Sequence, residues 1–148
     1  MAEQIGEGEP DLMVLSVLAM EAWLESRGWD EPPIVMALLR IEGPELEYAV
    51  LGEGDPYEIL IEAAPTSASL LLVAAEMWAW PPDLPESEQT GRPSEHPDRV
   101  EIRSVVALDQ SGQTIGVVRQ RGEAPFVERS CSGTLVDAMG AALAGADR

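Results

Sequence analysis

One short run, from His96 to Arg103 (HPDRVEIR), gathers residues whose types and spacing could do chemistry. Arg99, Glu101 and Arg103 stand two residues apart, and alternate residues of a β-strand point to the same face. Two guanidinium groups beside a carboxylate could hold an anionic ligand or a partner's carboxylate, with His96 entering from the edge of a loop. The plainer interpretation, which we favour, is a solvated strand face whose Arg-Glu pairs each contribute about 0.2–1 kcal/mol.

A second group of side chains, Glu76, Trp78 and Trp80, would share one face of the extended segment before this run. A carboxylate in an apolar segment is costly to bury unless it is paired, so we expect an arginine of the neighbouring strand to pair with Glu76. A buried acid with a shifted pKa can be catalytic, but a structural ion pair is the favoured interpretation. Trp78 and Trp80 could anchor an interface, and core packing is favoured for both.

Nucleophiles and metal ligands are scarce in this sequence, which has one histidine, His96, and one cysteine, Cys131. A nucleophile needs a base beside it, so Cys131 or a serine would depend on His96. Cys131 precedes a predicted helix whose dipole could lower the thiol pKa, but an inert cysteine is favoured. One His and one Cys cannot make an ordinary structural zinc site, and no calcium-loop spacing is present. We therefore expect no metal and no cofactor.

All nine basic residues are arginine, and the missing lysine excludes several function classes. Phosphate-loop nucleotide sites and protein kinases both need a lysine on the nucleotide phosphates. Schiff-base and pyridoxal enzymes need a lysine amine. Gly52 and Gly54 lack the third glycine and the long helix of a dinucleotide fingerprint, so they indicate a turn.

Three of these features together carry a resemblance to known proteins: the Glu-x-Trp of residues 76–78, the His96–Arg103 run, and Asp109-Gln110-Ser111-Gly112 with an arginine-bearing return strand. They resemble a family of small actinobacterial and actinophage proteins with the same order of motifs. The resemblance covers roughly residues 70–145. It implies an extended segment, a variable loop and a hairpin, and it implies no activity, because the family has none established.

The elements that must position these residues begin with a predicted helix from Asp11 to about Ser26, which Gly28 can end. Its apolar residues predict a well buried helix: Leu12, Leu15, Ala19, Ala22 and Trp23 follow the helical period, and Val14, Val17, Leu18 and Leu24 widen the stripe. Residues 34–41 and 48–51 are predicted to form a β-hairpin with its turn at 42–45.

In the second part of the chain, Asp55, Pro56 and Glu58 are typical of a helix start, so residues 56–64 are predicted to be helical, although their alternation also fits a strand. Residues 67–80 are apolar on both faces and suit a central strand, with a buried helix as the alternative. Residues 81–98 predict a long, Pro-rich surface loop. Strands over 99–108 and 114–121 are expected around a turn at 109–112. The last helix begins at Ser132 or Thr134.

We therefore expect an α+β fold: an antiparallel sheet of about five strands, with the N-terminal and C-terminal helices packed on it. The length of 148 residues suits one domain. Residues 1–10 are predicted to be a flexible acidic tail, and residues 11–148 a single domain.

Charge and targeting signals limit the expected partners and location. Residues 1–91 carry 19 acidic and 2 basic side chains, a net charge of −17, whereas residues 92–148 carry 8 acidic and 7 basic ones. Such a surface repels nucleic acid and anionic lipid, so we expect direct binding to neither. The acidic start lacks the pattern of a secretory signal, and no apolar run approaches the roughly 20 residues that span a bilayer. A soluble, cytoplasmic protein is expected.

These observations favour a non-catalytic protein-interaction module, an adaptor, chaperone-like or regulatory protein that binds a protein partner or itself as a homodimer. One alternative is an acidic inhibitor of phage origin that mimics nucleic acid, since duplex DNA presents a dense array of negative charge. The other is a small hydrolase or lyase that uses Glu76, His96 and Glu101 with support from arginine.

Overall fold

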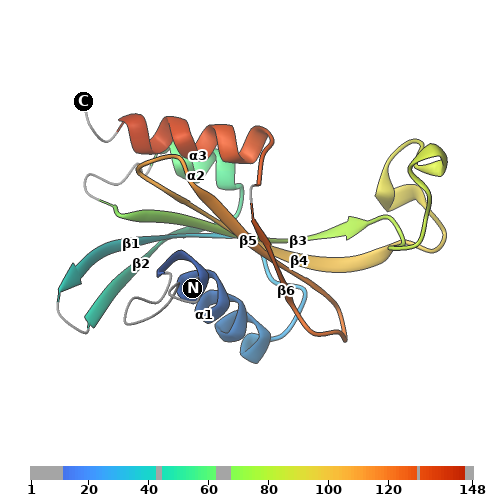
Figure 1. The fold of residues 1–148 in the computed structure, drawn as a ribbon, viewed down its shortest axis with the longest axis horizontal. Helices are drawn as coiled ribbons and strands as arrows, with labels where there is room; N and C mark the ends of the chain where they lie inside the picture. The colour runs from blue at the N-terminus through green and yellow to red at the C-terminus, as the bar shows by residue number, and fades with distance from the viewer. Residues whose placement is uncertain (1–11, 43–44, 63–67, 130, 146–148) are drawn as a thin grey trace, which may run out of the picture.

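A computed structural model describes residues 12–42, 45–62, 68–129 and 131–145 of the chain. It shows a six-stranded antiparallel sheet with helices on both faces (Figure 1). The elements are α1 (Leu12–Arg27), β1 (Ile34–Glu42), β2 (Glu45–Glu53), α2 (Pro56–Glu62), β3 (Leu70–Ala79), the short 3-10 helices η2 (Glu86–Glu88) and η3 (Pro93–Glu95), β4 (Val100–Asp109), β5 (Thr114–Gln120), β6 (Phe126–Arg129) and α3 (Thr134–Gly145).

The strand order is β2-β1-β3-β4-β5-β6, and each neighbouring pair is antiparallel. The expected α+β class and antiparallel sheet are confirmed, with six strands in place of about five. The additional strand is β6, which sequence patterns did not reveal because all four of its residues are exposed and none adds to an apolar face.

Local sequence signals explain where the main elements begin and end. Gly28 adopts a φ of 103° and its N–H donates to the Leu24 carbonyl at 3.0 Å, which ends α1. The Asp55 carboxylate accepts from the Tyr57 N–H at 3.0 Å at the start of α2, so the helix predicted over 56–64 is confirmed over Pro56–Glu62 and the strand alternative is wrong there. Residues 63–64 lie outside the described residues. Asp109 Oδ1 accepts from three donors in the 109–113 turn, which closes the β4–β5 hairpin.

Strand β3 lies in the middle of the sheet and is buried on both faces from Leu70 to Ala74. The central strand predicted over 67–80 is therefore confirmed over Leu70–Ala79, and the buried-helix alternative is wrong; residue 67 lies outside the described residues. One face of β3 packs under α1, together with apolar residues of β1, β4 and β5. The other face packs under α2 and α3. The sheet thus separates two apolar cores, one on each side (Figure 1).

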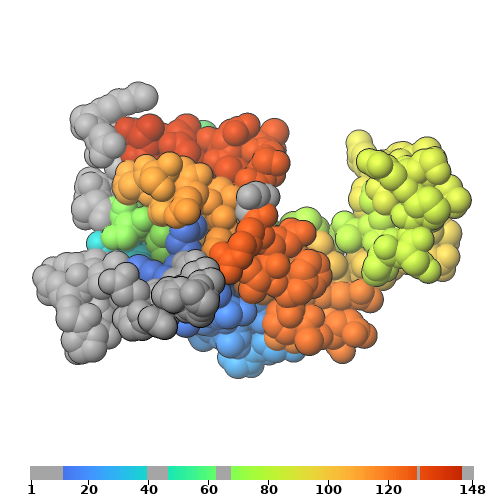
Figure 2. Space-filling model, in the orientation of Figure 1, coloured from blue at the N-terminus to red at the C-terminus, as the bar shows by residue number. Residues whose placement is uncertain are grey.

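Beyond Ala74, β3 pairs with β4 alone, and the two strands leave the body of the molecule as a ribbon. We call residues 77–100 the β3–β4 arm. The arm carries the long surface loop expected over 81–98, which contains η2 and η3. Figure 2 shows this loop as a lobe that stands away from the rest of the protein.

The face of α1 that packs on the sheet differs from the one predicted by apolar spacing. The buried residues of α1 are Met13, Ser16, Val17, Met20, Glu21 and Leu24. Five apolar residues of the predicted inner face, which we call the outer stripe, are instead exposed: Leu15, Leu18, Ala19, Ala22 and Trp23. The prediction was wrong because α1 is apolar around most of its circumference, so the partners of two polar residues, Ser16 and Glu21, set its rotation.

Within the described ranges, no helix is both long enough and apolar enough to cross a lipid bilayer.

Candidate functional site

Five of the residues singled out from the sequence lie on the α1 side of the sheet, on or next to two neighbouring strands. Glu76 stands opposite Arg103 in the β3–β4 register, and Trp78 stands opposite Glu101. Arg99 reaches the same side, because its guanidinium lies 4.4 Å from the centre of the Trp78 ring. The alternation of β-strands thus brings Glu76, Trp78, Arg99, Glu101 and Arg103 onto one face, as their spacing implied.

The centre of this face is a buried ion cluster that joins α1 to β4 and β5. Glu21 and Arg103 are each only 2% exposed. Glu21 accepts two hydrogen bonds from Arg103, at 3.2 and 2.7 Å, and two from Arg119, at 2.8 and 2.9 Å. Glu25, one turn further along α1, also accepts from Arg103. Every oxygen of the Glu21 carboxylate therefore faces a guanidinium group.

The electrostatics of the cluster keep Glu21 ionised. Burial acts to raise the pKa of Glu21, but hydrogen bonds and charges from Arg119 and Arg103 lower it by more, so the pKa lies below its ordinary value. The same hydrogen bond raises the pKa of Arg119. Arg103 also lies over Trp29, 4.5 Å from the ring centre. The cluster joins α1 to β4 and β5 through buried hydrogen bonds, and Nη1 of Arg103 is buried there without a hydrogen-bond partner among the described residues.

Glu76 has a different partner from the one predicted. Its two carboxylate oxygens accept from the backbone N–H groups of Asp30 at 2.8 Å and Glu31 at 3.2 Å. Asp30 has a φ of 70°, a conformation that L-residues seldom adopt. The expected arginine partner is replaced by backbone because the α1–β1 turn passes directly over this end of β3. Glu76 thus stabilises the turn that positions α1.

Three carboxylates approach one another beside this turn. Oxygens of Asp30, Glu76 and Glu101 all lie within 4.8 Å of each other. Nη1 of Arg121 lies 2.8 Å from Glu101 and 3.9 Å from Asp30. The guanidinium of Arg121 therefore supplies the counter-charge to the group, and we assign no metal ion to it.

His96 lies in the loop at the end of the arm. Its ring meets the Trp80 ring edge-on, with centres 5.7 Å apart, and its Nδ1 accepts from the Asp98 N–H at 3.0 Å. Trp80 is four residues beyond Glu76, which corresponds to roughly 13 Å along an extended chain. The structure thus brings Glu76 and Glu101 together and holds His96 against Trp80.

One other expectation from the sequence, the core packing of Trp78, needs correction. Trp78 does not pack in a core, because it is 43% exposed on the arm, where Arg99 covers one side of its ring. The surroundings of Cys131 agree with the inert cysteine that was favoured from the sequence. Burial and the nearby charge of Glu128 raise the pKa of its thiol, although a hydrogen bond with Thr114 lowers it in part.

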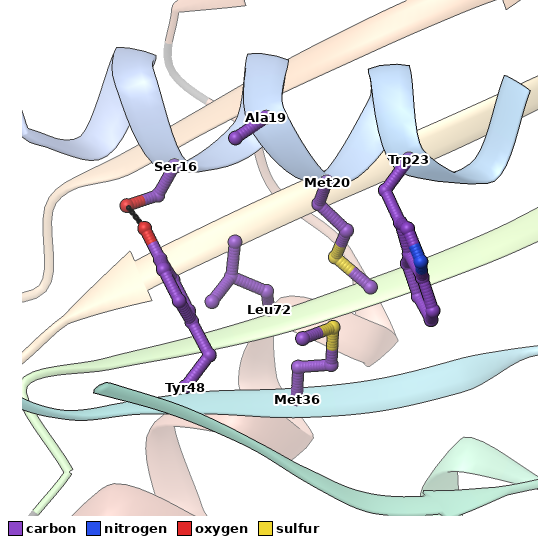
Figure 3. A pocket seen from close by; sticks show the side chains of 7 residues that line it. All are labelled: Ser16, Ala19, Met20, Trp23, Met36, Tyr48 and Leu72. Atoms are coloured by element: carbon purple, nitrogen blue, oxygen red, sulfur yellow. Dashed lines mark hydrogen bonds between the residues drawn. The ribbon is translucent and has the colours of Figure 1, made fainter. Parts of the chain in front are cut away.

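Sequence reasoning missed a cavity between α1 and the β1–β3 part of the sheet. Its volume is about 280 Å³, and it is lined by Ser16, Ala19, Met20, Trp23, Met36, Tyr48 and Leu72 (Figure 3). Ser16 and Tyr48 share a hydrogen bond of 2.9 Å at one end. The signal in the sequence was Ser16 itself, a polar residue in an apolar helix that needs a buried partner.

In comparisons with protein-family models, curated proteins and solved structures, no match to this chain was found. The function of the protein is therefore inferred from its own geometry.

Proposed function

We propose that this protein is a non-catalytic protein-interaction module, and that its docking surface is the outer stripe of α1. The occupant of this surface is a basic amphipathic helix of a partner protein. The observation that carries the proposal is the rotation of α1, which buries Ser16 and Glu21 while it exposes the stripe.

The outer stripe has the spacing of a helix–helix contact. Its residues follow i, i+3, i+4, i+7 and i+8 from Leu15 to Trp23, which places them along one continuous face. Leu15 is 47% exposed, Leu18 37% and Trp23 41%. A helix that is apolar on all sides is normally covered on all sides, and a continuous exposed apolar patch marks an interaction site.

The buried face of α1 also supports the outer stripe as a docking surface, because burying Glu21 on that face requires the arginines of β4 and β5 beside it. Removing the Glu21 carboxylate from water costs several kcal/mol, and the hydrogen bonds from the two arginines of β4 and β5 offset that cost. A helix rotated to bury the outer stripe would avoid this desolvation. The sheet thus buries the face of α1 that carries Ser16 and Glu21 among apolar residues, and leaves a second apolar face outward, which favours a function for the exposed face.

Charge favours a basic partner over a second copy of this chain. The protein has a formal net charge of −18, so it attracts a cationic helix over long range and repels an identical molecule. Glu25 is already paired with Arg103 and Arg119, and at the C-terminal end of the stripe Arg27 lies 4.8 Å from the centre of the Trp23 ring, so the attraction rests on the net charge of the protein. Leucine-rich contacts along the stripe would supply affinity, and basic flanks would supply orientation, as in other complexes where an amphipathic helix binds an apolar surface.

The non-catalytic part of the proposal is supported by the hydrogen bonds of the ionisable groups. Glu21 is held by Arg103 and Arg119, and Glu76 is held by backbone amides. Glu101 is paired with Arg121 at 2.8 Å. A general base must be able to reach a substrate proton, and these carboxylates already accept strong hydrogen bonds within the fold.

The test uses a synthetic amphipathic peptide with leucine along one helical face and arginine along the other. Its affinity is measured by fluorescence anisotropy for the wild-type protein, for Leu18→Glu and for Ile61→Glu. Ile61 is 80% exposed on α2, on the opposite side of the sheet, so both variants add the same charge at an exposed apolar residue. We expect Leu18→Glu to weaken binding roughly tenfold or more, because a carboxylate is buried unpaired in the contact.

Ile61→Glu should leave the affinity within about twofold, and a peptide with glutamate in place of arginine should not bind. Equal affinities for the two variants would contradict the proposal, since binding would then depend on net charge alone. Light scattering of the protein by itself tests whether a second copy of the chain covers the outer stripe instead of a partner helix. A dimer that is lost in Leu18→Glu and kept in Ile61→Glu would show that a second copy covers the stripe, and the partner helix would be wrong.

A further inference from the structure

The cavity beneath α1 has a chemistry that differs from that of the rest of the α1 face. Its walls are side chains from α1, β1, β2 and β3, and Figure 3 shows Met20, Met36 and Leu72 directed into the space between the helix and the strands. No charged side chain of the described residues lines it. We propose that this cavity is a binding site for an uncharged, mainly apolar small molecule, aliphatic or aromatic.

The lining decides the charge of the ligand. Glu21 follows the lining residue Met20 in α1, but its carboxylate is bonded to Arg103 and Arg119 and it is not a lining residue, so no cation or anion of the lining can pair with a charged ligand. An unpaired charge in such a site loses its hydration without compensation. A carboxylate or phosphate would also approach a protein whose net charge is −18.

At one end of the cavity, Ser16 Oγ and Tyr48 OH share a hydrogen bond of 2.9 Å, and the lining residue Trp23 adds an indole N–H. Each hydroxyl has one donor and two acceptor positions, so the pair keeps capacity for a further hydrogen bond. Because the pair lies at one end of the cavity, it can orient a ligand that carries a single hydroxyl or carbonyl group (Figure 3).

The volume decides the size of the ligand. At about 280 Å³ the cavity exceeds the roughly 150 Å³ apolar cavity that accommodates benzene, and it lies near the lower end of ligand pockets. It therefore has room for a bicyclic aromatic or a medium-length aliphatic molecule. Met20 and Met36 form facing walls, and methionine side chains adapt to ligands of different shape.

The experiment uses two dyes that differ mainly in one charged group, N-phenyl-1-naphthylamine and its sulfonated analogue 8-anilinonaphthalene-1-sulfonate. Binding is followed by dye fluorescence and by quenching of tryptophan emission, because Trp23 lines the cavity. We expect one site for the neutral dye and an affinity for the sulfonated dye that is lower by roughly tenfold or more.

Two substitutions narrow the cavity from opposite walls: Ala19→Phe from α1 and Met36→Phe from β1. Each should weaken binding of the neutral dye by roughly tenfold, while Leu18→Glu and Ile61→Glu, which lie outside the lining, should bind as the wild type does. Ala19 is exposed on the helix, so Ala19→Phe leaves the fold intact and decides the result even where Met36→Phe unfolds.

Three outcomes would overturn the proposal: no saturable binding of the neutral dye, unchanged binding in Ala19→Phe, or loss of binding in Leu18→Glu. The last outcome would place the dye on the outer stripe. Ala19 and Trp23 belong both to the outer stripe and to the lining of the cavity, but the dye titration uses the protein alone, so this proposal survives if the protein binds no partner helix. A negative peptide titration would therefore contradict the partner helix alone, and a negative dye titration would contradict the small-molecule site alone.

Discussion

Replacing Glu21 by glutamine removes the negative charge at the centre of the contact between α1 and the sheet. Glu21 accepts four hydrogen bonds from Arg103 and Arg119, and Arg103 is 2% exposed. The neutral amide keeps one acceptor oxygen but presents an NH₂ group to the guanidinium groups. Arg103 thus loses its main counter-ion while it stays buried.

The expected loss of stability in Glu21→Gln depends on the hydrogen bonds that Arg103 keeps in the variant. Breaking a buried pair by removing one partner costs about 3–5 kcal/mol. Glu25 still accepts from Arg103, and the amide oxygen still accepts one bond, so we expect the lower end, about 3 kcal/mol. For a chain of 148 residues this corresponds to a melting temperature lower by about 9 °C, at roughly 3 °C per kcal/mol.

The assay is urea unfolding at pH 7, followed by circular dichroism, with Glu25→Gln as the matched control. The control makes the same change one turn along the same helix, at a residue that is 41% exposed, and should cost less than about 1 kcal/mol. A loss for Glu21→Gln no larger than that for Glu25→Gln would refute the assignment of Glu21 as the residue that sets the rotation of α1.

The pH dependence gives a second check. The pKa of Glu21 is lower in the folded state, so its contribution to stability is fully present above the unfolded pKa of about 4.3 and is lost as the pH falls through the folded value. The gap in stability between wild type and Glu21→Gln should therefore narrow in acid, because protonated Glu21 also lacks the charge. A gap that stays constant from neutral pH into acid would contradict the pairing.

Three further predictions concern residues that the sequence singled out. Glu76→Ala should destabilise the protein by about 1–3 kcal/mol in urea unfolding, because two backbone N–H groups of the α1–β1 turn lose their acceptor. Glu76→Gln should cost less stability than Glu76→Ala, and equal costs would argue against the carboxylate as that acceptor. Trp78→Ala should cost less than about 2 kcal/mol, since the ring is exposed and packs on Arg99, whereas a core tryptophan would cost about 3–5 kcal/mol. The Cys131 thiol should react with iodoacetamide at pH 8 more slowly in the folded protein than in urea, because burial and Glu128 raise its pKa; a faster folded-state reaction would refute this.

The strands and turns of this fold were largely predictable from local sequence. Residues 67–80 are apolar on both faces, as a central strand requires, and Asp109 with Gly112 specified the β4–β5 turn. Strand β6 was not predictable, because its four residues are exposed and alternate neither in burial nor in polarity. A short edge strand of this kind is defined by its pairing with β5, which leaves no mark on local composition.

The orientation of α1 was beyond sequence reasoning for a physical reason. The helix is apolar on nearly all sides, so apolar spacing does not favour one face over another. Its rotation depends on Glu21, whose partners Arg103 and Arg119 lie 82 and 98 residues away in the chain. For the same reason the face of Glu76 and Arg103 was predictable from strand alternation, but the actual partners of both side chains were not.

The most direct test of the outer stripe as a docking surface is quantitative affinity capture from the native host with three baits: the wild type, Leu18→Glu and Ile61→Glu. We predict a protein that the wild type and Ile61→Glu enrich and that Leu18→Glu loses. That protein should contain a basic amphipathic segment, and a peptide of the segment should protect α1 from hydrogen exchange. Proteins captured equally by all three baits, or a peptide that leaves the exchange of α1 unchanged, would contradict the proposed function.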